Sequence, residues 1–164
     1  MKVAILMGSD SDWSRLQPCA AELKKHGVAV EARVLSAHRT PKQVVEFVEG
    51  APARGVEVLI CAAGGAAHLA GVVAAHTDLP VIGIPIDNPP LGGLDALLST
   101  VQMPGGVPVA SVAVGGGGPQ NAALFALRIL ALAHPELAPK LAQHRADMAK
   151  KVAEKDAALQ SKLD

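Results

Sequence analysis

KVAILM at residues 2–7, with GSDSD directly after it at residues 8–12, is the stretch that decides the fold. The hexapeptide is apolar almost throughout, which is typical of a strand buried on both faces of a parallel sheet. The glycine, serine and aspartate residues end this strand, and residues from about Asp12 to His26 carry an apolar stripe at helical spacing. The stretch therefore predicts a strand–loop–helix unit, the first half of a βαβ crossover.

This alternation of strand and helix continues along the chain. Apolar runs predict four further strands, at residues 28–35, 56–62, 81–85 and 107–114. Helical patterns are expected at about 41–50, 68–76, 94–100, 122–133 and 136–163. Five such strands with helical crossovers indicate an α/β three-layer sandwich with a doubly wound parallel sheet. We expect the flavodoxin-like strand order 2-1-3-4-5 and a C-terminal helical extension, within a single domain over residues 1–164.

Local signals refine this outline. Pro18 lies inside the first helix, where it removes an amide donor, so we expect a bend or an irregular first turn. The segment Thr40-Pro41-Lys42-Gln43 predicts a capping box with proline at the first helical position. Asn121 is expected to cap the helix that follows it. The histidines expected on the surface are His26, His134 and His144.

The composition limits the kind of protein. Half of the 164 residues are hydrophobic but only 2% are aromatic, which predicts a core of Val, Ile, Leu and Ala. Charged residues make up 18% of the chain, below the roughly 25% of soluble domains. We therefore expect a homo-oligomer whose subunits cover part of each other's surface, with an Ala- and Gly-rich monomer as the alternative. Cys19 and Cys61 lie in apolar stretches and are expected to be buried free thiols.

Charge and the N-terminal sequence exclude several classes of partner. The formal net charge is zero, which argues against nucleic acid, and no polybasic run favours a membrane surface. The apolar start ends at Gly8, too early for a signal peptide. No stretch approaches the length of a membrane span. A cytoplasmic location is the expectation.

Three loops are expected to meet at one edge of the sheet. Ligands of doubly wound sheets bind beyond the carboxyl ends of the strands, at the point where the strand order reverses. In the order 2-1-3-4-5, this rule brings together the loops after the first three strands, residues 8–12, 36–41 and 63–69.

The first of these loops suits a phosphorylated sugar. A helix N-terminus offers free amide donors to an anion, and Ser9 and Ser11 add hydroxyl groups. The Asp12 carboxylate would repel phosphate but can accept hydrogen bonds from neutral hydroxyls such as those of a ribose. Ordinary N-capping is the alternative explanation of these residues.

The other two loops add acid–base chemistry. His38 can move protons near neutral pH, and Arg39 beside it can pair with a phosphate. The loop Ala63-Gly64-Gly65-Ala66-Ala67-His68-Leu69 would let a ligand approach the backbone closely. A solvated capping turn and tight strand–helix packing are the respective alternatives. No metal is expected, because His38, His68 and His76 lack the spacing of a zinc motif.

Several motifs resemble one enzyme family. The segments GSDSDW at 8–13, SAHRTP at 36–41 and AGGAAHL at 63–69 resemble the signature loops of N5-carboxyaminoimidazole ribonucleotide mutase. This family is the class I form of the phosphoribosylaminoimidazole carboxylase catalytic subunit. Segments similar to the family also occur at LDALLS (94–99), VQMP (101–104) and NAAL (121–124), in the same order.

The resemblance implies an activity and a set of site residues. The family moves a carboxylate from the exocyclic nitrogen of an aminoimidazole ribonucleotide to ring carbon C4 in purine biosynthesis, without ATP, biotin or a metal, as a homo-octamer. It implies that Ser9, Asp12 and Arg39 bind the ribose phosphate, that His38 handles the C4 proton and that His68 lies near the migrating carboxylate. The remaining residues expected to bind substrate are Ser11, Ser36, Ala37, Gly64, Gly65, Ala66, Ala67 and Leu69.

Two other functions stay open at this stage. A class II relative carboxylates aminoimidazole ribonucleotide directly with CO2, and a non-catalytic ribonucleotide-binding module would not need His38. One further hypothesis concerns CO2 itself: the small side chains of residues 64–67 would form a dry pocket that retains it, so Ala67→Leu should abolish turnover.

Overall fold

The computed structural model describes residues 1–163 and contains a five-stranded parallel sheet. The strands are β1 (Lys2–Met7), β2 (Ala29–Val34), β3 (Val58–Ala63), β4 (Val81–Pro85) and β5 (Ala110–Ser111). Their order, β2-β1-β3-β4-β5, confirms the predicted topology. The chain divides into two compact units, residues 1–126 and residues 127–164, with the whole sheet in the first.

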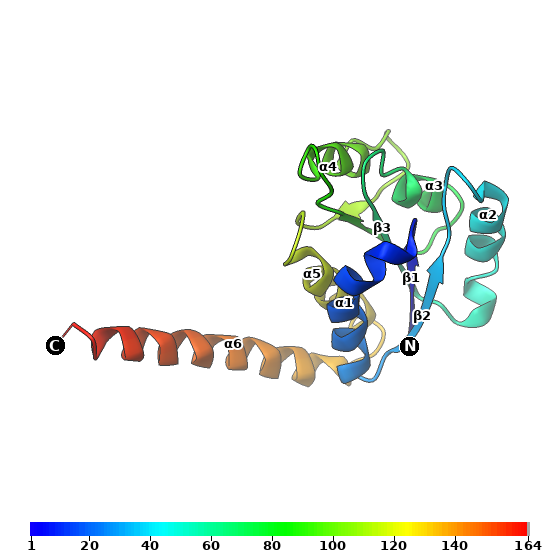
Figure 1. The fold of residues 1–164 in the computed structure, drawn as a ribbon. Helices are drawn as coiled ribbons and strands as arrows, with labels where there is room; N and C mark the ends of the chain where they lie inside the picture. The colour runs from blue at the N-terminus through cyan, green and yellow to red at the C-terminus, as the bar shows by residue number, and fades with distance from the viewer. Residues whose placement is uncertain (164) are drawn as a thin grey trace. The chain divides into compact units, whose positions relative to one another are not determined.

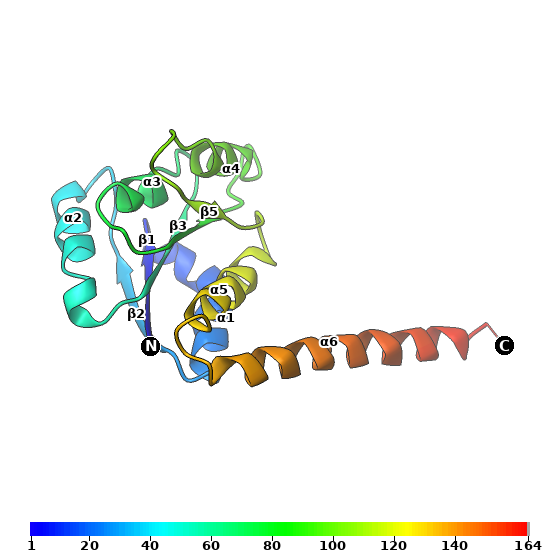
Figure 2. The ribbon, with the colours of Figure 1, turned by 180° about the vertical axis from the view of Figure 1, so that it is seen from behind.

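Helices connect the strands and cover both faces of the sheet in the first unit. They are the 3₁₀ turn η1 (Asp10–Asp12), α1 (Trp13–Lys25), α2 (Pro41–Glu49), the 3₁₀ turn η2 (Pro52–Arg54), α3 (Leu69–Ala74) and α4 (Leu94–Val101). Figures 1 and 2 show α1 on one face of the sheet, with α2 and α3 on the other. Pro18 lies inside α1, which is a single α-helix from Trp13 to Lys25. The 3₁₀ turn η1 directly before the helix is capped by Ser9, so it is not a consequence of Pro18.

The core between the sheet, α2 and α3 is aliphatic apart from Phe47 and Cys61, as the composition predicts. Ala4 and Leu6 of β1 join Leu59 and Cys61 of β3 in one cluster, because alternate residues of a strand point to the same face. Helices α2 and α3 contribute Val44, Phe47, Val48, Leu69, Ala70 and Val73 to this cluster. Cys19 and Cys61 are both buried and free, in agreement with the prediction.

The fifth strand is much shorter than predicted. Only Ala110 and Ser111 pair with β4, whereas a strand over residues 107–114 was expected. Pro108 has no amide hydrogen to donate to a neighbouring strand, which explains the late start. After the strand, only the Val112 amide continues the pattern, donating to the Gly83 carbonyl at 3.1 Å.

Two predicted helix caps are wrong. Helix α5 spans Gly118–Leu130, so Asn121 lies within its first turn rather than before it. Gly118 is the first residue of the helix, and a side chain at this position would collide with the Ala113 carbonyl. Thr40 precedes α2 but makes no side-chain cap. Its hydroxyl instead accepts from the Ser36 amide at 2.9 Å and donates to the Ser36 carbonyl at 3.2 Å.

The expectation that His26 lies on the surface is also wrong. This residue is only 4% exposed. Nδ1 lies 2.9 Å from the Glu22 carbonyl oxygen and 3.5 Å from a carboxylate oxygen of the same residue. His26 is the C-cap residue of α1, directly before the chain enters β2.

The second unit contains the end of α5 and the long helix α6 (Leu137–Gln160), close to the predicted 136–163. Leu137 and Leu141 are buried, whereas most residues beyond them are exposed. Among residues 1–163, no helix combines the length and apolar character that crossing a membrane requires.

Candidate active site

Backbone hydrogen bonds align the carboxyl ends of four neighbouring strands. The Leu35 amide donates to the Met7 carbonyl at 2.9 Å, and the Gly8 amide donates to the Ala62 carbonyl at 3.4 Å. On the far side of β3, the Ile86 amide donates to the Ala63 carbonyl at 3.0 Å. The loops after β2, β1, β3 and β4 therefore leave the sheet side by side.

A cleft of about 170 Å³ lies where these loops meet. The predicted residues that line it are Ser9, Ser11, Asp12, Ser36, Ala37, His38, Arg39, Gly64, Ala66, His68 and Leu69, together with Gly8, Ala63 and Asn88. Gly65 and Ala67 do not line it. Gly65 makes the turn with a φ of +64°, and Ala67 is 1% exposed because it points into the core. The Ala67 side chain therefore does not face the cleft, and substrate binding by Gly65 and Ala67 stays a prediction.

The loop after β1 combines capping with an unpaired carboxylate. The Ser9 hydroxyl accepts from the Ser11 amide at 3.3 Å and lies 2.8 Å from the Ser11 hydroxyl, so it caps η1. Asp12 is only 5% exposed, and its carboxylate makes no hydrogen bond within residues 1–163. Burial raises the pKa of Asp12, although the nearby Arg15 guanidinium opposes this shift and Asp10 adds to it. The Asp12 carboxylate is thus a buried acceptor available to a ligand.

The loop after β2 is braced internally and reaches across to the first loop. The Ser36 hydroxyl accepts from the Arg39 amide at 3.2 Å. The Arg39 guanidinium donates to the Gly8 carbonyl at 3.3 Å, with most of its donors still exposed. Arg39 therefore presents a positive charge beside the hydroxyls of the first loop.

His38 and His68 meet across the cleft. His38 Nε2 lies 2.8 Å from His68 Nδ1, and the ring planes are nearly perpendicular, at 85°. Imidazole nitrogens form such a bond only when one of them carries a proton and the other does not. Both rings are also exposed, so a ligand can reach them. The pair is suited to passing a proton between a ligand and the protein.

Asn88 is a cleft residue that sequence reasoning missed. It lies in the loop after β4 and joins the other three loops because β4 pairs with β3, with Pro85 opposite Ala63. The sequence did contain a signal for it, because ligands of such sheets bind beyond the carboxyl ends of the strands, and Asn88 follows β4, the neighbour of β3. Residues 86–93 are rich in Pro and Gly, which are typical of a connecting loop and do not by themselves indicate a ligand contact.

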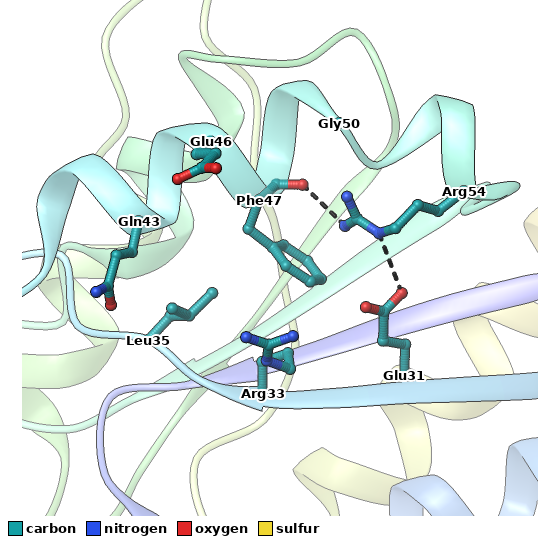
Figure 3. A pocket seen from close by; sticks show the side chains of 8 residues that line it. All are labelled: Glu31, Arg33, Leu35, Gln43, Glu46, Phe47, Gly50 and Arg54. Carbon is teal, nitrogen blue, oxygen red and sulfur yellow. Dashed lines mark hydrogen bonds and ion pairs between the residues drawn. The ribbon is translucent and has the colours of Figure 1, made fainter.

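A larger cleft of about 660 Å³ lies between β2 and α2, away from these loops. Figure 3 shows Arg54 directed at the ring of Phe47, with hydrogen bonds to the Phe47 carbonyl at 2.9 Å and to Glu31 at 3.4 Å. Its guanidinium carbon lies 4.2 Å from the ring centroid. Arg54 is thus engaged in holding α2 against β2, a structural role.

No group of three His, Cys, Asp or Glu side chains within residues 1–163 is arranged to hold a metal ion. The candidate site therefore consists of the small cleft, with its unpaired carboxylate, its arginine and its imidazole pair.

Comparison with known proteins assigns the family. The AIR carboxylase family matches residues 2–151. An N5-carboxyaminoimidazole ribonucleotide mutase of Saccharolobus solfataricus is 54% identical over 90% of this chain and 92% of its own length. One from Mycobacterium tuberculosis is 52% identical over 97% of this chain and 90% of its own length. The crystal structure of Treponema denticola PurE superposes with a TM-score of 0.87, at 33% identity, over 96% of this chain and 98% of that one. With a match over most of its length, this chain belongs to the AIR carboxylase family.

Proposed function

We propose that this chain is an N5-carboxyaminoimidazole ribonucleotide mutase. It converts the N5-carboxylated nucleotide into 4-carboxy-5-aminoimidazole ribonucleotide, a step of purine biosynthesis. The observation that carries the proposal is the 2.8 Å hydrogen bond between His38 and His68 in the same cleft as Asp12 and Arg39. The names of relatives about half identical over nine-tenths of the chain support it.

The ribose phosphate is held at the β2 and β1 side of the cleft. The Arg39 guanidinium and the hydroxyls of Ser9 and Ser11 provide donors for the phosphate oxygens. Asp12 accepts hydrogen bonds from the ribose hydroxyls. This division follows from charge, because a carboxylate would repel phosphate but attracts neutral hydroxyl donors. The cleft residues Ser36, Ala37, Gly64, Ala66 and Leu69 shape the surface around the nucleotide.

The reaction needs one proton delivered and one proton removed. Protonation of the exocyclic nitrogen breaks the N–C bond of the carbamate and releases CO2. The freed aminoimidazole is an enamine, so its C4 attacks CO2 and forms the new C–C bond. Removal of the C4 proton restores the aromatic ring. The imidazole pair delivers the first proton and recovers the second, so its net protonation is unchanged over one turnover.

CO2 must stay in the cleft between the two steps. Ala67 points into the core, so it cannot form the retaining surface. Ala63, Gly64, Ala66 and Leu69 line the cleft near His68 and are the apolar groups available for this role.

We also infer that the chain works as an assembly, an octamer as the family resemblance implies. Leu91, Leu94, Leu98 and Val101, on α4 and the turn before it, are between 48% and 59% exposed. Such a group of large apolar side chains is typical of a surface that contacts another subunit. The family match spans both compact units, which supports the single-domain interpretation.

The direct test follows the carboxyl transfer itself. Purified protein should convert the N5-carboxylated nucleotide into its C4-carboxylated isomer without ATP, added metal or bicarbonate. A requirement for bicarbonate with aminoimidazole ribonucleotide would instead identify a direct carboxylase.

A His38→Asn variant separates an enzyme from a binding module. We expect it to lose turnover while still binding the nucleotide, because Asn preserves polarity but cannot transfer a proton. His76→Asn is the matched control, since His76 lies outside the cleft, 3.9 Å from Glu49. Full turnover by the His38 variant would refute the assigned role.

A further inference from the structure

Asn88 occupies a defined position at the edge of the cleft. Arg15 of α1 donates from Nη1 to Asn88 Oδ1 at 2.8 Å. The same guanidinium lies 3.5 Å from an Asp87 carboxylate oxygen through Nε. Arg15 therefore ties the loop after β4 to the helix that begins beside Asp12.

This contact fixes the orientation of the Asn88 amide. An arginine can only donate hydrogen bonds, so the amide oxygen must face Arg15 and the NH2 group must face elsewhere. The NH2 nitrogen lies over Gly64, close enough that a side chain at residue 64 would collide with it. Asn88 thus presents donors to the part of the cleft beside the third loop. No hydrogen bond from this NH2 group is formed within the described residues.

The strand order indicates which end of the ligand these donors meet. Arg39 follows β2, Asp12 follows β1, His68 follows β3 and Asn88 follows β4. Adjacent strands are about 4.8 Å apart, so the four loops extend over roughly 14 Å. A nucleotide whose phosphate lies near Arg39 and whose ribose lies near Asp12 therefore extends its base toward Gly64 and Asn88.

We propose that Asn88 is a substrate-binding residue that donates a hydrogen bond from its NH2 group to the carboxylate on the imidazole of the ligand, and that Arg15 is its positioning residue. This inference rests on the proposed function. It assigns selectivity for the carboxylated nucleotides to a contact outside the three signature loops.

The test compares two nucleotides that differ only in the carboxylate. Calorimetry measures binding of 4-carboxy-5-aminoimidazole ribonucleotide and of 5-aminoimidazole ribonucleotide to the full-length protein. Asn88→Ala should weaken binding of the carboxylated nucleotide about 10- to 150-fold, the usual loss for a hydrogen bond to a charged group. It should leave the other nucleotide unchanged. Asn88→Asp should reduce the selectivity for the carboxylated nucleotide further, because it replaces the NH2 donor by a carboxylate of similar shape whose negative charge repels that of the ligand.

Arg15→Met tests the positioning role of Arg15 through the ratio of the affinities for the two nucleotides. Because Arg15 also lies near Asp12, its loss is expected to affect both nucleotides, but the ratio of their affinities should fall as in Asn88→Ala. Combining both substitutions should then reduce the ratio no further, since Arg15 acts on the carboxylate only through Asn88. Thermal unfolding of each variant establishes that it is folded.

The outcomes separate this inference from the proposed function. Equal weakening of both nucleotides by Asn88→Ala, or no weakening of either, would overturn the inference while leaving the mutase proposal intact. Failure of the unmodified protein to bind either nucleotide would overturn both.

Discussion

Replacing Asp12 by asparagine should make the protein more stable and its ligand weaker bound. In the free protein the carboxylate is 5% exposed and makes no hydrogen bond within residues 1–163. Burial disfavours its charged form and raises its pKa, an effect that Arg15 only partly offsets. Asparagine has nearly the same shape and carries no charge, so it removes the cost of burying an ion.

The size of the stability change depends on pH. Because the folded-state pKa of Asp12 is raised above its ordinary value of 3.8, the folded protein binds the proton more tightly than the unfolded chain does. The favourable contribution of the protonated carboxyl is complete below pH 3.8 and is lost as the pH rises through the folded-state pKa. Asp12→Asn should therefore unfold at a higher denaturant concentration than the unmodified protein at pH 7, and the difference should shrink as the pH falls toward 3.8.

The effect on binding has the opposite sign. Asparagine retains one acceptor oxygen, so the variant loses about one charge-assisted hydrogen bond to the ribose hydroxyls, worth about 1.5–3 kcal/mol. This corresponds to a Kd higher by about 10- to 150-fold. Urea unfolding at several pH values and calorimetry with the nucleotide measure the two effects independently. If Asp12→Asn is less stable at pH 7, the buried carboxylate does not destabilise the free protein. If the variant binds the nucleotide normally, the carboxylate does not bind the ribose.

Three further predictions concern regions away from Asp12. Arg54→Met should lower the free energy of unfolding by about 2 kcal/mol, because it removes the hydrogen bonds to the Phe47 carbonyl and to Glu31 as well as a cation–π contact with Phe47, while turnover per folded protein stays normal. Arg33→Met should cost less, because the Arg33 guanidinium carbon lies farther from that ring, at 5.7 Å. Burial raises the pKa of the Cys19 thiol to about 12 and that of Cys61 still further, so mass spectrometry should find neither thiol alkylated by iodoacetamide at pH 8 until denaturant is added. Leu98→Glu should lower the mass measured by light scattering, because it places a charge among exposed apolar side chains of α4, and an unchanged mass would exclude that surface from the assembly.

The fold could be predicted because its signals are local and repeated. The apolar run at residues 2–7 has no polar alternation, which only a strand covered on both faces explains. The run at residues 81–85 is equally apolar, whereas residues 28–35 alternate with Glu31 and Arg33 and form the largely exposed edge strand β2. A sheet of parallel strands joined by helices then allows few topologies. The exception is β5, whose length residue composition alone overestimated. Val107 and Val109 are typical of a strand, but Pro108 between them has no amide hydrogen to donate to a neighbouring strand.

The cleft was less predictable, because sequence does not show which way a side chain in a loop points. Ala66 and Ala67 are identical in chemistry and adjacent in the chain, yet the first lines the cleft and the second is 1% exposed in the core. Gly65, with its φ of +64°, makes the turn directly before these two residues. Thr40 illustrates the same point, since its hydroxyl bonds to the backbone of Ser36 rather than capping the helix.

Arg15 shows that a residue outside the cleft can affect ligand binding through the residues that line it. It does not line the cleft, but it stands three residues after Asp12, a spacing that places two side chains on the same side of a helix. From there its charge moderates the pKa of Asp12, and its guanidinium orients Asn88 on a loop 73 residues away. A single cation thus affects both the group proposed to hold the ribose and the group proposed to hold the carboxylate. Any substitution of Arg15 should consequently alter ribose binding and carboxylate selectivity together, even though the three signature loops remain unchanged.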